Sequence, residues 1–381
     1  MGPRPIWLKR LSAAFEKAPI CWLSGVRRVG KTTLCRALPG AVLLNCDLPE
    51  VARQLVDPVR FFNSVSGLLV LDEVHQLVDP SRVLKIAADE FPDLRIVATG
   101  SSTLAATEKF SDSLTGRKRH VHLLPVLVDE LPAFGVASLD ARMLKGGLPQ
   151  ALLAEQVDRS FYSEWLDSYF ARDVRELFRV EKRAGFLALL EALLRQSGGL
   201  LELTSMARVS GLSRPTVMTY LDVMEATHVL TRLRPFSGGV NDRDLVQAPK
   251  AFAFDTGFVC HARGVRDLRA EDRGPLLEHL TLETLQSLPE LPRIGYWRDK
   301  DKREVDFVLP FERDRVDALE VKWSGDAFEP RSLKAFRAHY PRGRNWLVTS
   351  QTGPAFTREV AGHEVTSVGI EGLRTALAAA S

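Results

Sequence analysis

The sequence predicts an α/β protein that begins with a parallel sheet, continues through a mostly helical middle and ends in a second α/β unit. Short apolar runs with helix-like segments between them occur at 20–24, 41–46, 67–71, 94–98 and 120–124. Strands that alternate with helices form βαβ units, and parallel strands buried on both faces read as continuous apolar runs. After Pro125 the pattern is mostly helical, and strand-like runs return from Pro249 onward.

Length and composition limit the class of protein. At roughly 150 residues per domain, 381 residues indicate two to four domains. A hydrophobic fraction of 45% and a net charge of +3 exclude bulk disorder and a histone-like polycation. No signal-peptide pattern, no uncharged apolar stretch of about 18 residues, and no CxxC or zinc spacing among the four cysteines is visible. We therefore expect a reduced, cytoplasmic chain without a membrane partner.

A phosphate-binding pattern follows the first predicted strand. Residues 25–32, GVRRVGKT, fit GxxxxGK[ST] and open a predicted helix, which is the context that this motif needs. Gly25 and Gly30 would let backbone N–H groups wrap the phosphates, and the helix N-terminus would add its positive dipole end. Lys31 would reach the β- and γ-phosphates, and the Thr32 hydroxyl would ligate Mg²⁺. The predicted cofactors are ATP or ADP with Mg²⁺.

Two acids follow the apolar run at 67–71. An acid at the carboxyl end of a parallel strand faces the crevice in which ligands bind. Asp72 is predicted to hold Mg²⁺ through water, and Glu73 to orient or deprotonate the attacking water. The structural alternative is an acidic surface turn. Ser101 follows the next strand, where a polar sensor of the γ-phosphate would lie, although Gly-Ser-Ser is commonly only a turn.

Arg117 precedes the last predicted strand of this sheet. A cation there can project toward a neighbouring subunit's nucleotide and stabilise charge on the transferring phosphoryl group. We select Arg117 over Arg119 for this role, with a solvated basic turn as the alternative. The role requires a homo-oligomer.

Several motifs in order resemble those of a widespread prokaryotic group of AAA-type (AAA+) P-loop ATPases with a C-terminal domain of unknown function. The matching segments are GVRRVGKTTL, LLVLDEVHQL, ATGSS, the LTGR turn and GGLPQAL, and the resemblance covers nearly the whole chain. It implies an ATPase core at 1–135, a helical lid at 136–195, a winged helix at 196–240 and a restriction-endonuclease-like (PD-(D/E)xK) α/β domain at 241–381.

The resemblance also implies further nucleotide contacts. A GxP element in the lid of related ATPases contacts the nucleotide, and Gly147-Leu148-Pro149 resembles it. Within the phosphate-binding loop the family often has Pro-Arg-Gln; here Arg27 matches, and Val26 and Arg28 do not. The predicted cofactor-binding residues are Gly25, Arg27, Gly30, Lys31, Thr32, Thr33, Ser101, Gly147 and Pro149.

The segment at 200–236 has the pattern of a helix-turn-helix. Gly211 turns the chain, Ser213 is a good N-cap, and Val217, Leu221 and Met224 form an apolar helix face. The second helix of such a unit often enters the DNA major groove. Residues 195–250 hold seven Lys and Arg against five Asp and Glu, a small excess for neutralising phosphates. DNA contact and plain domain packing both stay open.

A group of acids with one lysine marks the last unit. Asp306 lies in one predicted strand, and Glu320 and Lys322 share a face of the next. With Glu278 from a preceding helix, Asp306 and Glu320 would hold Mg²⁺ or Mn²⁺ through oxygen ligands, and Lys322 would position the metal-activated water. This pattern is similar to that of restriction-endonuclease-like nucleases. The structural alternative is a solvent-facing salt bridge between two amphipathic strands.

Two functions are compatible with these features. The first is an ATP hydrolase that couples nucleotide state to DNA binding or processing, with a metal-dependent C-terminal nuclease site. The second is a nucleotide-dependent switch or signalling scaffold whose nuclease-like domain is inactive and only contacts proteins. Glu73 beside Asp72 and the large C-terminal region disfavour a third, a metabolic kinase.

Overall fold

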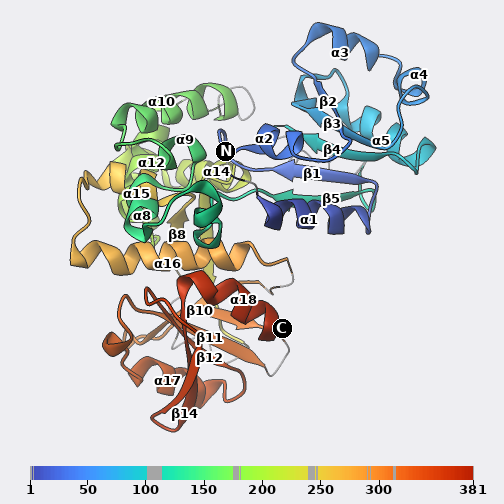
Figure 1. The fold of residues 1–381 in the computed structure, drawn as a ribbon. Coiled ribbons are helices and arrows are strands. Elements are labelled where there is room, and N and C mark those ends of the chain that lie inside the picture. Colours follow the sequence, from blue (N-terminus) through green and yellow to red (C-terminus); the bar gives the residue numbers. More distant parts are fainter. Residues whose placement is uncertain are drawn as a thin grey trace.

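The computed structural model describes residues 2, 4–100, 114–174, 180, 182–238, 245, 248–289, 291, 293–311 and 315–380. Ser101 therefore lies outside the described residues. The chain forms three parts (Figure 1): an N-terminal parallel sheet with its helices, a group of helices beside it, and a C-terminal sheet, with the long helix α16 between the last two. Among the described helices, none combines the length and apolar character needed to cross a bilayer.

The N-terminal sheet has five parallel strands in the order β2-β3-β4-β1-β5. Its strands are β1 (Ile20–Ser24), β2 (Val42–Asn45), β3 (Leu68–Asp72), β4 (Arg95–Thr99) and β5 (Lys118–His122). Each overlaps one of the five predicted apolar runs, so the parallel α/β core is confirmed. The helices around it are α1 (Pro5–Phe15), α2 (Lys31–Arg36), α3 (Pro49–Gln54), α4 (Pro58–Phe62) and α5 (Pro80–Glu90).

Both faces of this sheet are covered, which explains the continuous apolar runs. On β1, Cys21 and Leu23 belong to the same apolar cluster as Trp7 of α1. Trp22, which points to the other face, belongs to a second cluster with Leu84 of α5. Alternate residues of β1 thus enter two separate apolar cores, which accounts for a continuous apolar run from Ile20 to Leu23.

The helices that follow pack against one another and against a later part of the chain. They are η2 (Val128–Phe134), α8 (Leu139–Lys145), α9 (Pro149–Leu152), α10 (Arg159–Tyr169), the π-helical η3 (Phe170–Val174) and α12 (Arg183–Arg195). Helices α8 and α12 both contact α15 (Thr256–Arg263). The predicted lid at 136–195 is therefore packed on residues beyond 241.

A helix-turn-helix unit follows α12. It consists of α13 (Leu203–Ser210) and α14 (Arg214–Ala226), joined through Gly211 at φ +66°. The Ser213 hydroxyl accepts a hydrogen bond from the Thr216 N–H at 3.3 Å, as an N-cap does. Val217, Leu221 and Met224 are buried, as the predicted apolar face requires.

The remaining strands form one mixed sheet of nine, in the order β13-β14-β12-β11-β10-β9-β7-β8-β6. Its strands are β6 (Gly199–Leu200), β7 (Leu230–Pro235), β8 (Lys250–Ala253), β9 (Gly295–Arg298), β10 (Glu304–Pro310), β11 (Val316–Val321), β12 (Asn345–Thr349), β13 (Phe356–Val360) and β14 (His363–Gly369). The helices of this part are α16 (Ala270–Gln286), η5 (Gly325–Ala327), α17 (Arg331–His339) and α18 (Ile370–Ala380). Because Arg234 of β7 pairs with Gly295 of β9, the sheet crosses the boundary predicted at 241.

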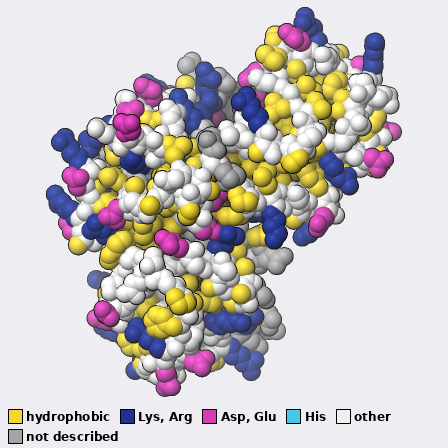
Figure 2. Space-filling view, in the orientation of Figure 1, with side chains coloured by type: hydrophobic (Ala, Val, Ile, Leu, Met, Phe, Trp, Pro, Cys, Tyr) yellow, Lys and Arg dark blue, Asp and Glu magenta, His cyan; other side chains and the backbone are white. Residues whose placement is uncertain are grey.

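Polar contacts link η2 and α1 to later parts of the chain. Arg374 of α18 forms an ion pair with Asp129 of η2. Arg10 of α1 donates a hydrogen bond at 3.0 Å to the Ser287 carbonyl, just after α16. The space-filling view shows cations and carboxylates interspersed on the visible face, with no broad area of a single sign (Figure 2).

Candidate functional site

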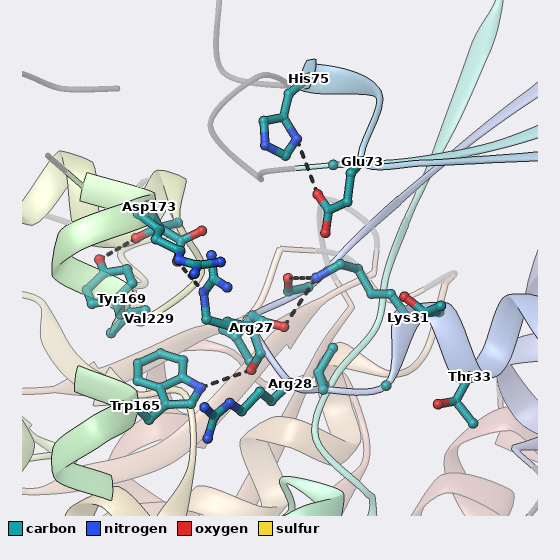
Figure 3. A pocket seen from close by; sticks show the side chains of 18 of the residues that line it. Arg27, Arg28, Lys31, Thr33, Glu73, His75, Trp165, Tyr169, Asp173 and Val229 are labelled. Atoms are coloured by element: carbon teal, nitrogen blue, oxygen red, sulfur yellow. Dashed lines mark hydrogen bonds and ion pairs between the residues drawn. The ribbon is translucent and has the colours of Figure 1, made fainter. Parts of the chain in front are cut away.

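A cleft of about 720 Å³ lies at the carboxyl ends of β1 and β3 (Figure 3). Its floor is the phosphate-binding loop, and its walls come from α10, η3 and the turn between α14 and β7. The residues that line it are Gly25 to Thr33, Asp47, Glu73, His75, Gln76, Gly100, Gln150, Trp165, Tyr169, Arg172, Asp173, Thr227 and Val229. The predicted residues Gly25, Arg27, Gly30, Lys31, Thr32 and Thr33 are all among them.

The phosphate-binding loop depends on its two glycines. Gly25 has φ +147° and Gly30 φ +102°, conformations that side chains rarely adopt. A Cβ on Gly25 would also lie 2.6 Å from the Leu123 carbonyl oxygen. Lys31 Nζ donates to the carbonyl oxygens of Gly25 at 2.8 Å and Val26 at 3.3 Å, so the ammonium lies inside the loop. Burial lowers the pKa of Lys31, and nearby Glu73 opposes that effect.

The two predicted Mg²⁺ ligands of this site are in contact. Thr32 Oγ1 donates to Asp72 Oδ2 at 2.8 Å, and the Thr99 hydroxyl donates to the other oxygen of the same carboxylate. Thr99 also accepts from the Glu73 N–H at 3.2 Å. Adjacent hydroxyl and carboxylate oxygens suit Mg²⁺, which prefers hard oxygen ligands and keeps several waters. The donor set therefore fits the expected metal.

Glu73 enters the cleft from a strained backbone. Its φ of +57° is a left-handed conformation, which costs free energy for a side chain other than Gly and is common at functional sites. Burial raises its pKa, while Lys31 and then His75 work in the opposite direction. His75 Nδ1 lies 3.2 Å from Glu73 Oε2. A raised pKa near a phosphate-binding loop is what a general base for water needs, and sequence reasoning missed His75.

One wall of the cleft comes from residues about 140 positions after the phosphate-binding loop in the sequence. Arg27 Nε forms an ion pair with Asp173 Oδ2 at 2.9 Å, and Trp165 Nε1 donates to the Arg27 carbonyl at 3.0 Å (Figure 3). Arg172 lines the same cleft. The sequence segment YFARDV thus supplies part of the nucleotide-site wall, a role that no local pattern indicated.

The other wall comes from the turn after the helix-turn-helix. Thr227 and Val229 line the cleft, and the Tyr169 hydroxyl hydrogen-bonds to Thr227 Oγ1 at 2.7 Å. Between them, His228 has φ +61° and lies against His122, with ring centroids 3.9 Å apart and the ring planes tilted by 39°. The helix-turn-helix unit is therefore in direct contact with the nucleotide cleft.

Three histidines lie together behind this turn. Ser24 Oγ hydrogen-bonds to His120 Nε2 at 2.6 Å and to His122 Nδ1 at 3.0 Å, and His228 contacts both rings. Burial lowers the pKa of His120 to about 4 and that of His228 to about 3, and it lowers the pKa of His122 as well. The rings are therefore neutral in the folded protein near pH 7. Among the described residues, no group of three or more His, Cys, Asp or Glu side chains is placed to hold a metal ion.

This cluster predicts that the protein loses stability in acid. The imidazole of His228 binds a proton below about pH 6.5 in the unfolded chain, but only near pH 3 in the folded protein. The free energy of unfolding therefore decreases as pH falls below 6.5. His228→Asn, which tolerates the positive φ, should reduce that loss by up to about 3 kcal/mol between pH 6.5 and 4. Urea unfolding at several pH values measures it. An identical pH dependence in the variant would contradict the prediction.

Other predicted nucleotide contacts lie elsewhere. Gly147 and Pro149 do not line the cleft, although their neighbour Gln150 does. The Gly147 N–H donates to Asp255 Oδ2 at 2.6 Å, and a Cβ there would lie 2.6 Å from Arg142. In this structure Gly147 serves close packing between α8 and α15.

Arg117 lies at the amino end of β5, opposite the edge that carries the cleft. Its guanidinium forms two hydrogen bonds to Asp89, with Nε 2.5 Å and NH2 3.1 Å from the carboxylate oxygens. The pair is partly exposed. Arg117 is thus remote from the nucleotide cleft of its own chain.

The predicted C-terminal acids are brought together. Strands β10 and β11 form the expected antiparallel hairpin, and the register Phe307↔Leu319 places Asp306 opposite Glu320. Lys322 Nζ lies 3.2 Å from Glu320 Oε2 and 3.7 Å from Asp306 Oδ2. Glu278 of α16 is close enough for the Asp306 charge to raise its pKa further, although burial is the larger cause.

Sequence reasoning missed three further members of this cluster. Lys250, the first residue of β8, is buried and forms ion pairs with Glu278 and Glu304. Arg298 NH1 lies 2.8 Å from Glu304 Oε2. An EVD pattern could have signalled Glu304, because residues two apart on a strand share a face. Lys250 lies more than 50 residues upstream of both strands, and no spacing rule connects it to them.

Comparisons with known proteins match three segments. Residues 17–131 match the model of an AAA domain, 136–269 a domain of unknown function (DUF8612) and 273–367 another (DUF4143). Two mycobacterial proteins, Mb2031c of Mycobacterium bovis and Rv2008c of Mycobacterium tuberculosis, are described as uncharacterized. Each is 29% identical over 339 residues, which cover 86% of this chain and 75% of the relative.

Two solved structures give low overall similarity. Drosophila ORC bound to AT-rich DNA and Cdc6 has a TM-score of 0.22 and 11% identity, over 67% of this chain and 91% of that one. Thermococcus gammatolerans McrB with bound McrC has a TM-score of 0.23 and 13% identity, over 51% and 52%. The assignment therefore rests on the matched segment, its sheet and its loop. Residues 17–131 match the model of an AAA domain, and the parallel sheet in this segment agrees with that match.

Proposed function

We propose that this protein binds and hydrolyses ATP with Mg²⁺ in the cleft above the phosphate-binding loop. The observation that carries the proposal is the run of contacts from Thr32 through Asp72 and Thr99 to Glu73. These contacts support the proposal because a hydroxyl and a carboxylate that could bind Mg²⁺ lie beside a carboxylate of raised pKa.

Each residue has a defined part in that reaction. Loop N–H groups and Lys31 would hold the phosphates, and Thr32 and Asp72 would hold Mg²⁺, which would supply positive charge near the phosphate oxygens. Glu73 orients the attacking water or accepts its proton, a function that the raised pKa supports. His75, 3.2 Å from that carboxylate, fixes its orientation.

Replacing Glu73 by Gln tests this assignment. The amide keeps the shape and cannot accept the proton, so we expect ATP to bind and turnover to fall by roughly 10²–10⁴-fold. Binding of a fluorescent ATP analogue and release of phosphate measure the two effects separately. Glu90→Gln, at an exposed position of α5, is the matched control. Wild-type turnover by Glu73→Gln would remove Glu73 from the base role.

The finer proposal is that the nucleotide state controls contact with DNA. It is supported by the helix-turn-helix unit, whose following turn supplies Thr227 and Val229 to the cleft wall. The charges of the helix-turn-helix unit favour DNA contact less, because Arg232 forms ion pairs with Asp222 and Glu225. The alternative is a switch in which the same unit contacts a protein.

Glu73→Gln also separates these alternatives, since it holds ATP without hydrolysing it. Fluorescence anisotropy with labelled duplex and single-stranded DNA should give an affinity that differs between ATP and ADP and weakens with salt. If neither DNA binds at low salt in either state, the protein-contact switch is the better proposal.

The proposed homo-oligomer rests on Arg117. Because this residue lies at the edge of the sheet opposite its own cleft, it could contact a nucleotide only on a neighbouring copy. There it would stabilise charge on the transferring phosphoryl group.

A second candidate function is a metal-dependent nuclease at the C-terminal acids. Among the described residues, Glu320 Oε1 is one of few buried side-chain oxygens without a hydrogen-bond partner. An unpartnered carboxylate oxygen beside Asp306 has the chemistry of a ligand for Mg²⁺, which would activate a water there. Lys322, next to both carboxylates, is placed to position that water.

Asp306→Asn tests the nuclease proposal. Removing one ligand charge should abolish cleavage of single- and double-stranded DNA in Mg²⁺ or Mn²⁺ and leave ATP hydrolysis unchanged. Asp326→Asn, an exposed position outside the cluster, should retain both activities. Equal cleavage by wild type and Asp306→Asn, or no cleavage by wild type under any condition, would contradict the proposal.

A further inference from the structure

Lys250 occupies an unusual position in the C-terminal cluster. Its side chain is only 4% exposed, and its Nζ lies 2.8 Å from Glu278 Oε1 and 2.5 Å from Glu304 Oε1. These carboxylates come from α16 and from β10, so the ammonium bridges the helix and the sheet. It also lies 5.6 Å from the ring centroid of Tyr296. One buried cation is therefore shared by two carboxylates of different elements.

The other half of the cluster also has a shared cation, Lys322, but one of its buried carboxylate oxygens has no partner. Asp306 Oδ2 accepts the Val321 N–H at 2.8 Å, and Lys322 Nζ lies 3.7 Å from Asp306 Oδ2 and 3.2 Å from Glu320 Oε2. Glu320 Oε1 has no partner, and Glu320 is 5% exposed. A buried oxygen left without a hydrogen bond indicates a missing ligand at this end of the cluster.

The charges of the cluster limit how many ions it can accept. Four carboxylates (Glu278, Glu304, Asp306 and Glu320) face Lys250, Lys322 and Arg298. With all four carboxylates ionised, one negative charge is uncompensated. One divalent ion would turn that into a single positive charge, whereas a second would leave three positive charges in a largely buried site, which is strongly unfavourable.

We propose that this cluster takes one divalent metal ion, held by Asp306 and Glu320, and that the Lys250 ammonium replaces a second ion between Glu278 and Glu304. The inference rests on the metal site proposed above and adds its stoichiometry. Glu278 is then a partner of Lys250 and not a metal ligand. In two-metal sites the second ion stabilises one of the reacting oxygens; here a fixed ammonium supplies that charge.

Counting bound Mn²⁺ tests the inference without any activity. The full-length protein without nucleotide is titrated with MnCl₂, and free Mn²⁺ is followed by electron paramagnetic resonance. Ions bound elsewhere, including at Thr32 and Asp72, are common to all variants, so differences between variants report the cluster. Wild type should bind one ion more than Asp306→Asn. Lys250→Met should bind one ion more than wild type, and Lys250→Arg, which keeps the charge, should match wild type.

Glu278→Gln provides a second measurement that does not depend on replacing a buried lysine. Because Glu278 is not a ligand in this proposal, the variant should bind as many ions as wild type. Loss of an ion in Glu278→Gln, no gain in folded Lys250→Met, or a wild type that exceeds Asp306→Asn by two ions would each overturn the inference. Equal binding by wild type and Asp306→Asn would instead overturn the metal site itself, so the two failures are distinguishable.

Discussion

Lys31→Ala is expected to abolish ATP turnover, with a loss on the order of 10²-fold or more. The Lys31 ammonium lies inside the phosphate-binding loop, 2.8 Å from the Gly25 carbonyl, and carries the charge nearest to where phosphates would lie. Burial lowers its pKa, so its positive charge depends on anionic partners, with Glu73 the largest of them in the folded protein. Bound phosphates would be further anionic partners of Lys31. They would favour its charged form and so strengthen phosphate binding.

Phosphate release by purified protein measures the effect, and nucleotide binding by a fluorescent analogue locates it. We expect both to fall, because the same ammonium contacts ground-state and transition-state phosphates. Lys17→Ala, at an exposed position after α1, removes a lysine without entering the cleft and should behave as wild type. Undiminished ATPase activity in Lys31→Ala would mean that the hydrolysis occurs elsewhere.

Arg142→Met is expected to give the largest loss of stability, about 3–5 kcal/mol. Arg142 is 0% exposed and forms an ion pair with Glu283 of α16. It also donates to the Val126 carbonyl at 2.7 Å and to Thr256 Oγ1 at 3.0 Å. The variant would leave the Glu283 carboxylate buried without its cation, and burial already raises the pKa of that group to about 7.

Urea unfolding followed by circular dichroism measures this loss. If the parts of the chain unfold in separate transitions, the one that unfolds the helices is compared. Arg195→Met is the control, because the exposed Arg195–Glu191 pair should contribute at most about 1 kcal/mol. Arg142→Met combined with Glu283→Leu should recover part of the loss, since both charges are then removed. If the single variant unfolds at the wild-type urea concentration, Arg142 does not join α8 to α16 in the way described.

Local sequence patterns predicted a strand or hairpin accurately where a single short segment is enough to specify it. The apolar run at 20–24 became β1 at the same bounds, because a strand buried on both faces must be continuously apolar. The two strands carrying Asp306 and Glu320 pair as an antiparallel hairpin for a similar reason: a short turn leaves few other arrangements.

Boundaries between parts were harder to predict. A break at 241 followed from a Gly-Gly pair and a charged run, yet β7 pairs with β9 across it. A turn signal marks where the chain changes direction, and it carries no information on which strands later meet in one sheet.

The sequence by itself determined the phosphate-binding loop, the acids at the end of β3 and the Asp306–Glu320 pair, because in each case the chemistry lies within a few residues or on neighbouring strands. Only the tertiary structure decided which residues complete those sites: Asp173 opposite Arg27, Thr227 and Val229 in the cleft wall, and Lys250 between Glu278 and Glu304. These partners are separated by tens to more than a hundred residues. Their meeting depends on how buried helices and strands pack together, which no local spacing encodes.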